Sequence, residues 1–373
     1  MRDDLVELLS GLVAIDSVNP SLVPGGAGEA EAASFIVDWA RGAGLDAELL
    51  EETPGRPNAV VHARGGGGGR TLMLCGHIDT VNVEGMSDAH VPRVEGDRLY
   101  ARGAYDMKAG VAAALIACRE AAKLGLAGDV LVAAVADEEH ASFGVQEVLR
   151  SVSADAAVVT EPTELEIAVA HKGFVWAEIE VTGRAAHGSR PHLGVDAIVK
   201  AGPVLTVLGE LDRSLEQKVH PLVGRGSVHA SVIAGGVELS SYPERCVVGL
   251  ERRTIPGETA ADIEAELEAL LERCRAADPE LVVEKRMGLV REPFEVDPDA
   301  DIVTAVVAEV GGAHPVSGAS YWADSAFISA AGIPTVLYGP SGEGAHAQVE
   351  WVSIADTETV ARTLVGVASR ICG

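Results

Sequence analysis

The chain has 373 residues, 47% of them hydrophobic, and this length favours two domains with buried cores over a single one. Its formal net charge of −27 would repel a polyphosphate backbone, which argues against a nucleic-acid partner. The five cysteines form no CxxC pair, so we expect reduced thiols. Charges interrupt the first 20 residues and no apolar run reaches membrane-spanning length, so we expect a cytoplasmic protein with no membrane partner.

Helical and strand-like patterns alternate along the first part of the chain. Apolar residues recur with helical spacing over residues 3–15, 29–42 and 106–124. Short β-rich runs lie between the helices, among them residues 71–75 and 130–136. This alternation predicts an α/β domain in which helices cover both faces of a mixed sheet.

A run of five glycines, RGGGGGR at residues 64–70, separates two strand-like segments. A phosphate-binding loop would need a following Gly-Lys-Ser or Gly-Lys-Thr and a helix, and neither is present. We therefore reject a nucleotide-binding protein and interpret the run as a flexible hairpin loop.

The pattern changes at about residue 174. Residues 174–286 read as strand, helix, two strands, helix and strand, which is the order of a small α+β, ferredoxin-like unit with an antiparallel sheet. The β/α pattern resumes with ADIVTAVVAEVGG and GIPTVLYGP. We therefore predict a discontinuous catalytic domain over residues 1–173 and 287–373, interrupted by an inserted domain over 174–286.

Residue types that commonly serve as metal ligands follow four apolar segments that we expect to be strands. They are His77 and Asp79 after TLMLCG, Asp137, Glu138 and Glu139 after VLVAAVA, Glu161 after DAAVVT, and His346 after PTVLYGPSGEGA. In an open α/β sheet the ligand crevice lies outside the carboxyl ends of the strands, so these side chains should converge. Taken singly, Asp106 is an adequate helix N-cap and adjacent acids are usually a solvated loop. Clustered carboxylates, however, would repel one another unless cations lay between them.

The chemistry of this set predicts a two-metal hydrolase. Carboxylates and imidazoles without a thiolate suit Zn²⁺, with Co²⁺ or Mn²⁺ as alternatives. Two ions about 3.5 to 4 Å apart need a bridging carboxylate, flanking ligands for each ion and a position for an attacking water.

At this point the residues resemble a known family, the di-zinc deacylases and metallopeptidases typified by acetylornithine deacetylase, succinyl-diaminopimelate desuccinylase, aminoacylase and carboxypeptidase G. The resemblance covers nearly the whole chain. Its motifs, in order, are LLSGLVAIDSVNPS, GHIDTV, ARGAYDMKAG, ADEEH, VVTEPT, GRAAHGSRPHLGVDAI, CVVGLERRTIPGET, GIPTVLYGPSGEGAHA and VEWV. Each motif alone is weak, but all of them in this order are specific.

The resemblance implies the metal ligands. His77 and Glu161 would hold one ion, Glu139 and His346 the other, and Asp106 would bridge both. The family also implies a cis peptide bond after Asp106.

The resemblance implies the other site residues as well. Asp79 would orient His77, and Glu138 would act as the general base that takes a proton from the attacking water and delivers it to the leaving nitrogen. His187, on the inserted domain, would reach the active site of the other subunit of a homodimer and donate to the oxyanion. Arg253 would pair with the carboxylate of the substrate.

Departures from the family pattern concern the substrate. Ser240 stands where many relatives have an asparagine, and Asp196 where many have another asparagine. Asp324 follows Tyr321 and Trp322, which suggest an aromatic wall for an acyl pocket. We take Ser240 and Asp324 as candidate substrate contacts.

The sequence thus predicts a hydrolase that cleaves the amide bond of an N-acyl amino acid. A dipeptidase or carboxypeptidase of the same family is the nearest alternative. A non-catalytic binding protein that keeps the fold is an alternative from another class, but it would have no need to retain Glu138 and every ligand. The acyl group, the side chain of the substrate, the physiological metal and the pathway stay open.

Overall fold

The computed structural model describes residues 1–311 and 315–373, and these form two compact units. Unit 1 comprises Met1–Val169, Val296–Ser317 and Ala323–Gly373. Unit 2 comprises Ala170–Glu295 and Gly318–Trp322.

A mixed sheet, nine-stranded among the described residues, forms the centre of unit 1, although its residues 170–171, 294–295 and 318–319 are counted with unit 2. Its strands are β1 (Asp46–Leu50), β2 (Asn58–Ala63), β3 (Leu72–His77), β6 (Val130–Val135), β7 (Ala156–Val159), β8 (Ile167–His171), β17 (Phe294–Glu295), β18 (Val316–Ala319) and β19 (Thr335–Leu337). Their order is β1-β2-β6-β3-β7-β19-β8-β17, with β18 beside β8. Strands β6, β3, β7 and β19 are parallel neighbours, whereas β1, β2, β8 and β17 join by antiparallel pairing.

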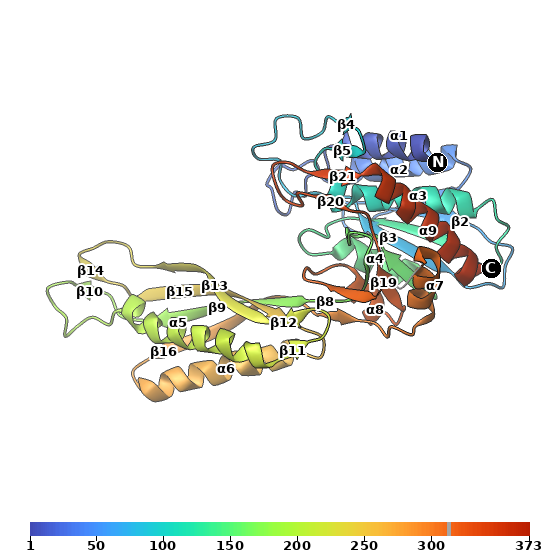
Figure 1. Cartoon of the computed structure of the whole chain (residues 1–373). Coiled ribbons are helices and arrows are strands. Elements are labelled where there is room, and N and C mark those ends of the chain that lie inside the picture. The colour runs from blue at the N-terminus through green and yellow to red at the C-terminus, as the bar shows by residue number, and fades with distance from the viewer. Residues whose placement is uncertain (312–314) are drawn as a thin grey trace. The chain divides into compact units, whose positions relative to one another are not determined.

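Helices cover this sheet on both faces. They are α1 (Arg2–Val13), α2 (Ala30–Gly42), α3 (Ala109–Ala121), α4 (Phe143–Ser151), α7 (Asp301–Val310), α8 (Ser325–Ala330) and α9 (Ile354–Cys372). Every residue of β3 and of β6 is buried, and successive residues of a strand face opposite sides, so neither side of these strands meets solvent. Helix α3 packs against α9 and is itself almost wholly buried (Figure 1). The predicted fold class is confirmed.

The glycine-rich segment between β2 and β3 is not a hairpin loop, and that prediction was wrong. Strand β6 lies between β2 and β3 and pairs with both. The segment instead packs against the chain that leads into β6, where Gly66 N–H donates to Leu126 O at 2.8 Å and Gly67 N–H to Ala127 O at 2.8 Å. A Cβ on Gly69 would lie 2.2 Å from Gly128 N, so a side chain would not fit there.

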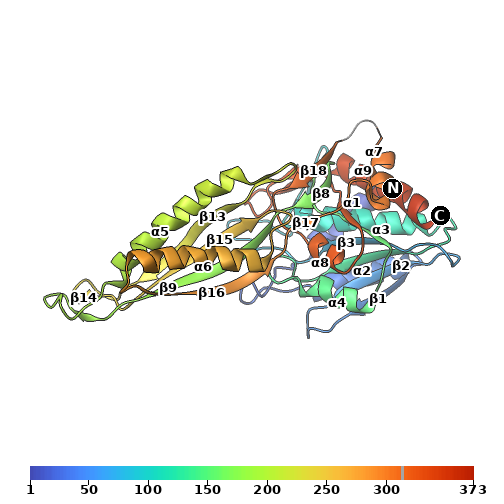
Figure 2. The same ribbon diagram turned by 90° about the horizontal axis from the view of Figure 1, so that it is seen from below.

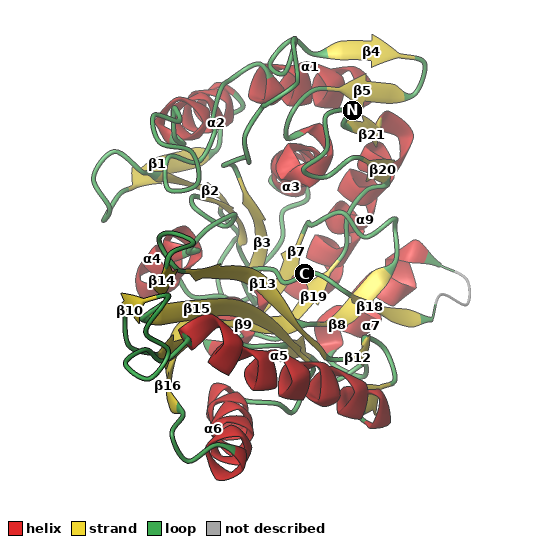
Figure 3. Ribbon diagram, turned by 90° about the vertical axis from the view of Figure 1, so that its left-hand side faces the viewer, coloured by secondary structure: helices red, strands yellow, loops and turns green. Residues whose placement is uncertain are grey.

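A smaller four-stranded sheet also belongs to unit 1. Its order is β20 (Gly342–Glu343), β21 (Trp351–Ser353), β5 (Arg98–Tyr100) and β4 (Arg93–Glu95). Strand β21 lies beside β5 with Trp351 opposite Tyr100 (Figure 3). This register brings the chain before residue 351 next to the chain after residue 100.

Unit 2 is a four-stranded antiparallel sheet with two helices. In chain order its main elements are β9 (Gly173–Thr182), α5 (Ala197–Ser214), β13 (Ser227–Gly235), β15 (Arg245–Thr254), α6 (Ala260–Ala277) and β16 (Val282–Arg291). The strand order is β13-β15-β9-β16. Both helices lie on one face of the sheet (Figure 2), where buried residues of β9 such as Val175 and Ile179 share a core with Leu267 and Leu271 of α6. The order of elements matches the ferredoxin-like order expected from the sequence.

Four short strands complete unit 2: β10 (Ala186–His187), β11 (Val219–His220), β12 (Gly224–Arg225) and β14 (Ser241–Tyr242). The expected limits of the inserted domain, residues 174 and 286, lie inside the unit. Unit 2 extends further because β16 continues to pair with β9 as far as Arg291. Within the described residues of the whole chain, we find no helix that combines the length and the apolar character of a membrane span.

Candidate metal centre

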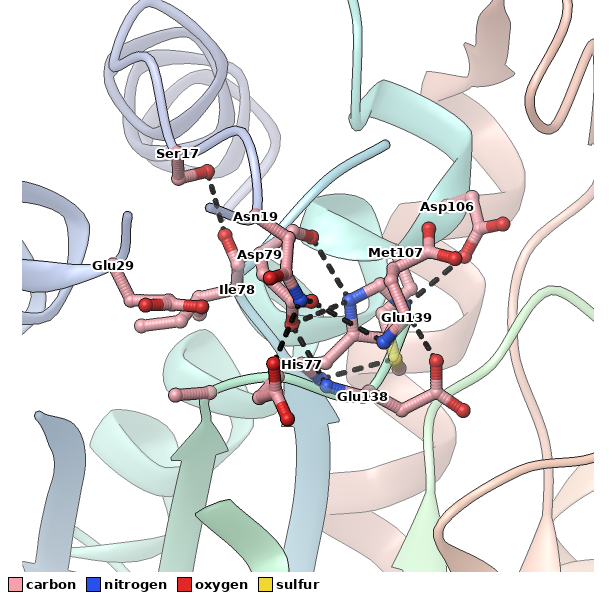
Figure 4. Close-up of polar contacts among 12 residues, drawn as sticks. Ser17, Asn19, Glu29, His77, Ile78, Asp79, Asp106, Met107, Glu138 and Glu139 are labelled. Carbon is pink, nitrogen blue, oxygen red and sulfur yellow. Dashed lines mark hydrogen bonds and ion pairs between the residues drawn. The ribbon is translucent and has the colours of Figure 1, made fainter. Parts of the chain in front are cut away.

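Three parallel strands position the first candidate ligands. Strand β3 ends at His77, which lies opposite Val135 of β6, and Cys75 lies opposite Val159 of β7. The chain that leaves each strand therefore emerges at the same edge of the sheet. Figure 4 shows His77 gathered there with Glu138 and Glu139, which follow β6.

Asp106 reaches the same place from an irregular turn, Ala104–Lys108, just before α3. The backbone departs from helical angles at Asp106 and Met107, and the peptide bond between them is cis, as the resemblance implied. One carboxylate oxygen, Oδ1, lies 3.2 Å from His77 Nε2, and the other, Oδ2, lies 3.4 Å from His346 Nε2. Asp106 therefore spans the gap between two imidazoles, and it does not serve as a simple helix N-cap.

The other three candidates, Glu138, Glu139 and Glu161, lie close to His77 or His346. His346 Nε2 lies 3.0 Å from Glu139 Oε2, and His77 Nε2 lies 4.0 Å from Glu161 Oε1 and 3.9 Å from Glu138 Oε2. In each of two groups of three residues, one potential ligand atom per residue lies within 4.8 Å of the other two. The groups share His77 and are His77, Glu138 and Glu161, and His77, Asp106 and Glu139.

The donor set fits a pair of divalent cations. Glu161 Oε1 is buried and has no hydrogen-bond partner among the described residues. A buried carboxylate oxygen without a partner is costly unless a ligand satisfies it. Oxygen and imidazole donors without sulfur suit Zn²⁺, Co²⁺ or Mn²⁺.

The pKa shifts in the cluster agree with a site for divalent cations. Burial, together with nearby carboxylates, raises the pKa of Glu138 and of Glu161 well above the usual value. Burial alone would also raise the pKa of Asp106, but hydrogen bonds from His346 and His77 lower it. Hydrogen bonds to Asp106 and Glu139 raise the pKa of His346 to about 10. Positive charge beside these carboxylates, from protonated imidazoles or from bound cations, lowers the cost of burying them.

Asp79 supports the cluster from behind. His77 Nδ1 lies 3.0 Å from the backbone oxygen of Asp79 and 3.6 Å from its Oδ1, so the backbone oxygen is the nearer partner. The carboxylate oxygens accept the backbone N–H groups of Glu138 at 3.1 Å and of Glu139 at 3.2 Å. Burial would raise the pKa of Asp79, but the bonds from His77 and Asn19 lower it.

A buried polar chain behind Asp79 was not anticipated from the sequence. Asn19 Nδ2 donates to Asp79 Oδ2 at 2.7 Å and to Asp137 Oδ1 at 3.0 Å. Arg56 pairs with Asp137 at 3.2 Å and with the buried carboxylate of Glu29. These residues are scattered over more than a hundred positions; Asn19 and Asp137 lie inside family motifs, but no motif connects them with Glu29 and Arg56.

His187 lies in β10 of unit 2 and is exposed. Its Nδ1 accepts the backbone N–H of Ser189 at 3.2 Å and lies 2.8 Å from Ser189 Oγ. An acceptor nitrogen has no proton, so the proton of the neutral ring lies on Nε2, which is free to donate. This assignment follows from the hydrogen bonds.

The candidate substrate residues lie in both units. Arg253, in β15, is half-buried, with Nε 2.7 Å from Glu251 Oε1 and its guanidinium over the ring of Phe174. Ser240 is exposed in unit 2, where its backbone oxygen accepts a hydrogen bond from Gly188 N at 2.7 Å. Asp324 is buried in unit 1 just before α8.

Asp196, the other departure from the family pattern, has a structural role. It is the N-cap of α5, and its Oδ1 accepts the Val199 N–H at 3.0 Å.

Comparisons with known proteins identify the relatives of the chain. The model of peptidase family M20/M25/M40 matches residues 73–370. Acetylornithine deacetylase of Myxococcus xanthus is 31% identical over an alignment that covers 100% of both chains. The aminopeptidase PepT of Bacillus cereus has a similar fold, with a TM-score of 0.80 at 17% identity, covering 100% of this chain and 99% of that one. The YXEP protein of Bacillus subtilis, described as a dinuclear metal binding peptidase, has a TM-score of 0.77 at 15% identity, covering 100% and 98%. The chain therefore belongs to peptidase family M20/M25/M40, as a metallohydrolase whose described residues include His, Asp and Glu side chains placed so that they could hold metal.

Proposed function

We propose that this protein hydrolyses the amide bond of an N-acyl amino acid at a centre of two divalent metal ions. The observation that carries the proposal is the carboxylate of Asp106, with one oxygen facing His77 and the other facing His346. A carboxylate held between two imidazoles is suited to bridge two ions.

The proposed ligands divide into two sets around this bridge. His77 and Glu161 hold one ion, and Glu139 and His346 hold the other. Zn²⁺ is the expected metal, with Co²⁺ or Mn²⁺ as alternatives. When bound, the pair of ions would lower the pKa of the attacking water and polarise the amide carbonyl.

Glu138 is the proposed general base. Its side chain is buried beside the ligands, and its pKa is raised by that burial, as suits a carboxyl group that must hold a proton for part of the cycle. Its neighbour Glu139 faces His346, so the two adjacent acids have different partners. In this role Glu138 takes a proton from the water and passes it to the leaving nitrogen.

Asp79 is the proposed orienting residue of the site. Its backbone oxygen contacts the ring of His77, and its carboxylate holds the backbone N–H groups of Glu138 and Glu139. A single residue thereby fixes a ligand and the base relative to one another.

Unit 2 is proposed to complete the site and to form a homodimer. His187 has an Nε2–H free to donate to an oxyanion, and the family resemblance puts it in the site of the partner subunit. Strand β13 is an edge strand with exposed Val232 and Ile233, and α5 exposes Ile198 and Val199. Exposed apolar side chains along an unpaired edge are typical of an interface.

The substrate class rests on the relatives. The similarity to acetylornithine deacetylase over the full chain favours an N-acyl amino acid. In this proposal Arg253 pairs with the substrate carboxylate through its guanidinium, and Ser240 and Asp324 contribute further contacts. A dipeptidase or carboxypeptidase is the second candidate, which the likeness to an aminopeptidase fold keeps open.

A hydrolysis screen tests the proposal. Purified protein loaded with Zn²⁺ or Co²⁺ is incubated with N-acetyl, N-succinyl and N-formyl amino acids and with dipeptides, and released amine is measured. We expect turnover of at least one N-acyl amino acid that chelation abolishes. Cleavage of dipeptides alone would favour the second candidate, and no turnover of any amide by metal-loaded protein would favour the non-catalytic alternative.

A further inference from the structure

A buried ion pair, Arg102 with Glu350, lies behind the candidate metal centre in unit 1. Both side chains are buried, at 3% and 0% exposed, and Arg102 Nη1 donates to Glu350 Oε2 at 2.6 Å. Neither residue belongs to the proposed ligands or to the proposed catalytic groups. The pairing of β5 with β21 explains why they meet, because Arg102 follows β5 and Glu350 precedes β21.

The carboxylate of Glu350 holds the turn that presents Asp106. Glu350 Oε1 accepts the backbone N–H of Tyr105 at 2.8 Å and that of Asp106 at 3.1 Å. Its other oxygen accepts the backbone N–H of Gly103 at 3.1 Å. Three N–H groups of one turn therefore converge on a single buried carboxylate, which fixes the backbone of the proposed bridging ligand.

The guanidinium of Arg102 holds two other segments. Its Nε donates to the backbone oxygen of Asn82 at 3.1 Å, on the chain that follows His77. Its Nη2 donates to the backbone oxygen of Ala347 at 3.0 Å, directly after His346. The planar fork of an arginine can make these contacts together with the ion pair, whereas a lysine ammonium cannot span all of them.

Stability alone is a weak reason for this arrangement. An apolar pair of similar volume is often as stable as a buried ion pair, because removing two charges from water is costly. What the pair adds is a fixed relation among three chain segments that are far apart in sequence and that contribute His77, Asp106 and His346.

We propose that Arg102 and Glu350 are positioning residues that preset the spacing of His77, Asp106 and His346 before metal binds. This inference rests on the proposed metal centre. Residues that orient metal ligands typically change metal affinity by roughly 10- to 100-fold when they are altered. The pair should therefore affect metal affinity in addition to folding stability.

The test measures metal binding directly. Metal-free wild type, Glu350→Gln and Arg102→Lys are titrated with Co²⁺, and both the dissociation constants and the visible absorption of the bound ion are recorded. The glutamine keeps the shape of Glu350 but turns an amide N–H₂ toward donors, so part of the turn is released. We expect both variants to bind Co²⁺ roughly 10- to 100-fold more weakly than wild type and with an altered absorption spectrum.

Unit 2 offers a matched control. Glu258 is a buried carboxylate that accepts from Arg252 Nη2 at 2.9 Å and from the backbone N–H of Ile255 at 3.0 Å. It thus combines an arginine and a backbone N–H as donors, as Glu350 does in unit 1. Glu258→Gln should lower the thermal midpoint in EDTA and leave Co²⁺ affinity unchanged.

The outcomes separate the two ideas. The positioning role alone would be overturned if the unaltered protein binds two ions and both Glu350→Gln and Arg102→Lys bind Co²⁺ with the same affinity and spectrum. Failure of wild type itself to bind two ions would overturn the proposed metal centre. If Glu350→Gln does not fold, Arg102→Lys, which retains the positive charge, decides the question.

Discussion

One buried cluster in unit 2 and one in unit 1 balance charge in opposite ways. In unit 2 the guanidinium of Arg252 is fully buried and is met by the carboxylates of Glu258 and Glu266, so each buried charge has a partner of opposite sign. In unit 1 four carboxylates meet at one edge of the sheet: Asp106, Glu138, Glu139 and Glu161. Among the described residues, these carboxylates form ion pairs only with His77 and His346.

The difference in charge balance indicates a structural role for the cluster in unit 2 and a cation-binding role for the cluster in unit 1. A balanced pair is complete within the fold, whereas four carboxylates against two imidazoles leave a deficit of positive charge. Cations that are bound after folding can supply that charge. The predictions below test this contrast between a self-sufficient unit 2 and a unit 1 that depends on metal.

The largest effect is expected in unit 1 for Glu138→Gln. The amide has nearly the same shape but cannot accept a proton, so kcat should fall by roughly 10²- to 10⁴-fold while both ions stay bound. Metal content by elemental analysis and turnover are measured together. Glu139→Gln is the matched neighbour, and it should lose metal because Glu139 faces His346. Near-normal kcat in Glu138→Gln would require another base.

The next effect concerns His187. His187→Ala removes the Nε2–H, the proposed oxyanion donor. It should lower kcat by roughly 100- to 1000-fold and leave the metal content unchanged. His192, exposed in the same segment, provides the control, and His192→Ala should have little effect.

A mixing experiment tests whether His187 acts across a dimer. Glu138→Gln and His187→Ala are combined under conditions of proven subunit exchange. Half of the dimers are then mixed, and each mixed dimer has one site with both groups, so activity should recover to roughly a quarter of wild type. No recovery would mean that His187 does not act in the partner's site.

Breaking the balanced cluster of unit 2 should affect stability and not chemistry. Glu258→Gln removes the buried one of the two carboxylates that meet Arg252, and loss of a partner in a buried pair costs about 3 to 5 kcal/mol in the free energy of unfolding. Urea unfolding should show the same loss with EDTA and with Zn²⁺. A loss that Zn²⁺ rescues would contradict the contrast between the units.

The smallest effect is a dependence of metal-free stability on pH. The pKa of His346 is raised from 6.5 to about 10, so its contribution is complete below pH 6.5 and is lost as the pH rises toward about 10. The raised pKa values of Glu138 and Glu161 act in the same direction, and the lowered value of Asp106 affects only the acidic range. In EDTA, the free energy of unfolding should fall across this window. His346→Asn should flatten the slope, and an unchanged slope in that variant would contradict the assignment.

Much of unit 1 and its site followed from the sequence. The strands β3, β6 and β7 were visible as apolar runs, and the rule that ligands gather at the carboxyl ends of parallel strands brought His77, Glu138 and Glu161 together. His346 follows the rule less directly, since it lies nine residues beyond β19, on the segment between β20 and β21. The strand-end pattern made His346 a candidate, and the family resemblance paired it with Glu139.

The supporting groups could not be predicted in this way. Arg102 and Glu350 meet only because β5 pairs with β21, a contact between segments about 250 residues apart that no local pattern specifies. Asn19 and Arg56 likewise contact Asp137 through the fold alone. The glycine run was misread because strand order, and not the adjacent sequence, decides whether two consecutive strands form a hairpin.

The position of β19 in the large sheet has a consequence for biosynthesis. This strand, residues 335–337, lies between β7 and β8, whose residues emerge from the ribosome much earlier. Until β19 arrives, β7 and β8 have unpaired edges, which can pair with another nascent chain. The segment 170–295 of unit 2 is already complete by then. Aggregation of truncated or stalled chains should therefore begin at this gap in the middle of the sheet, and a peptide with the sequence of β19 would be expected to suppress it.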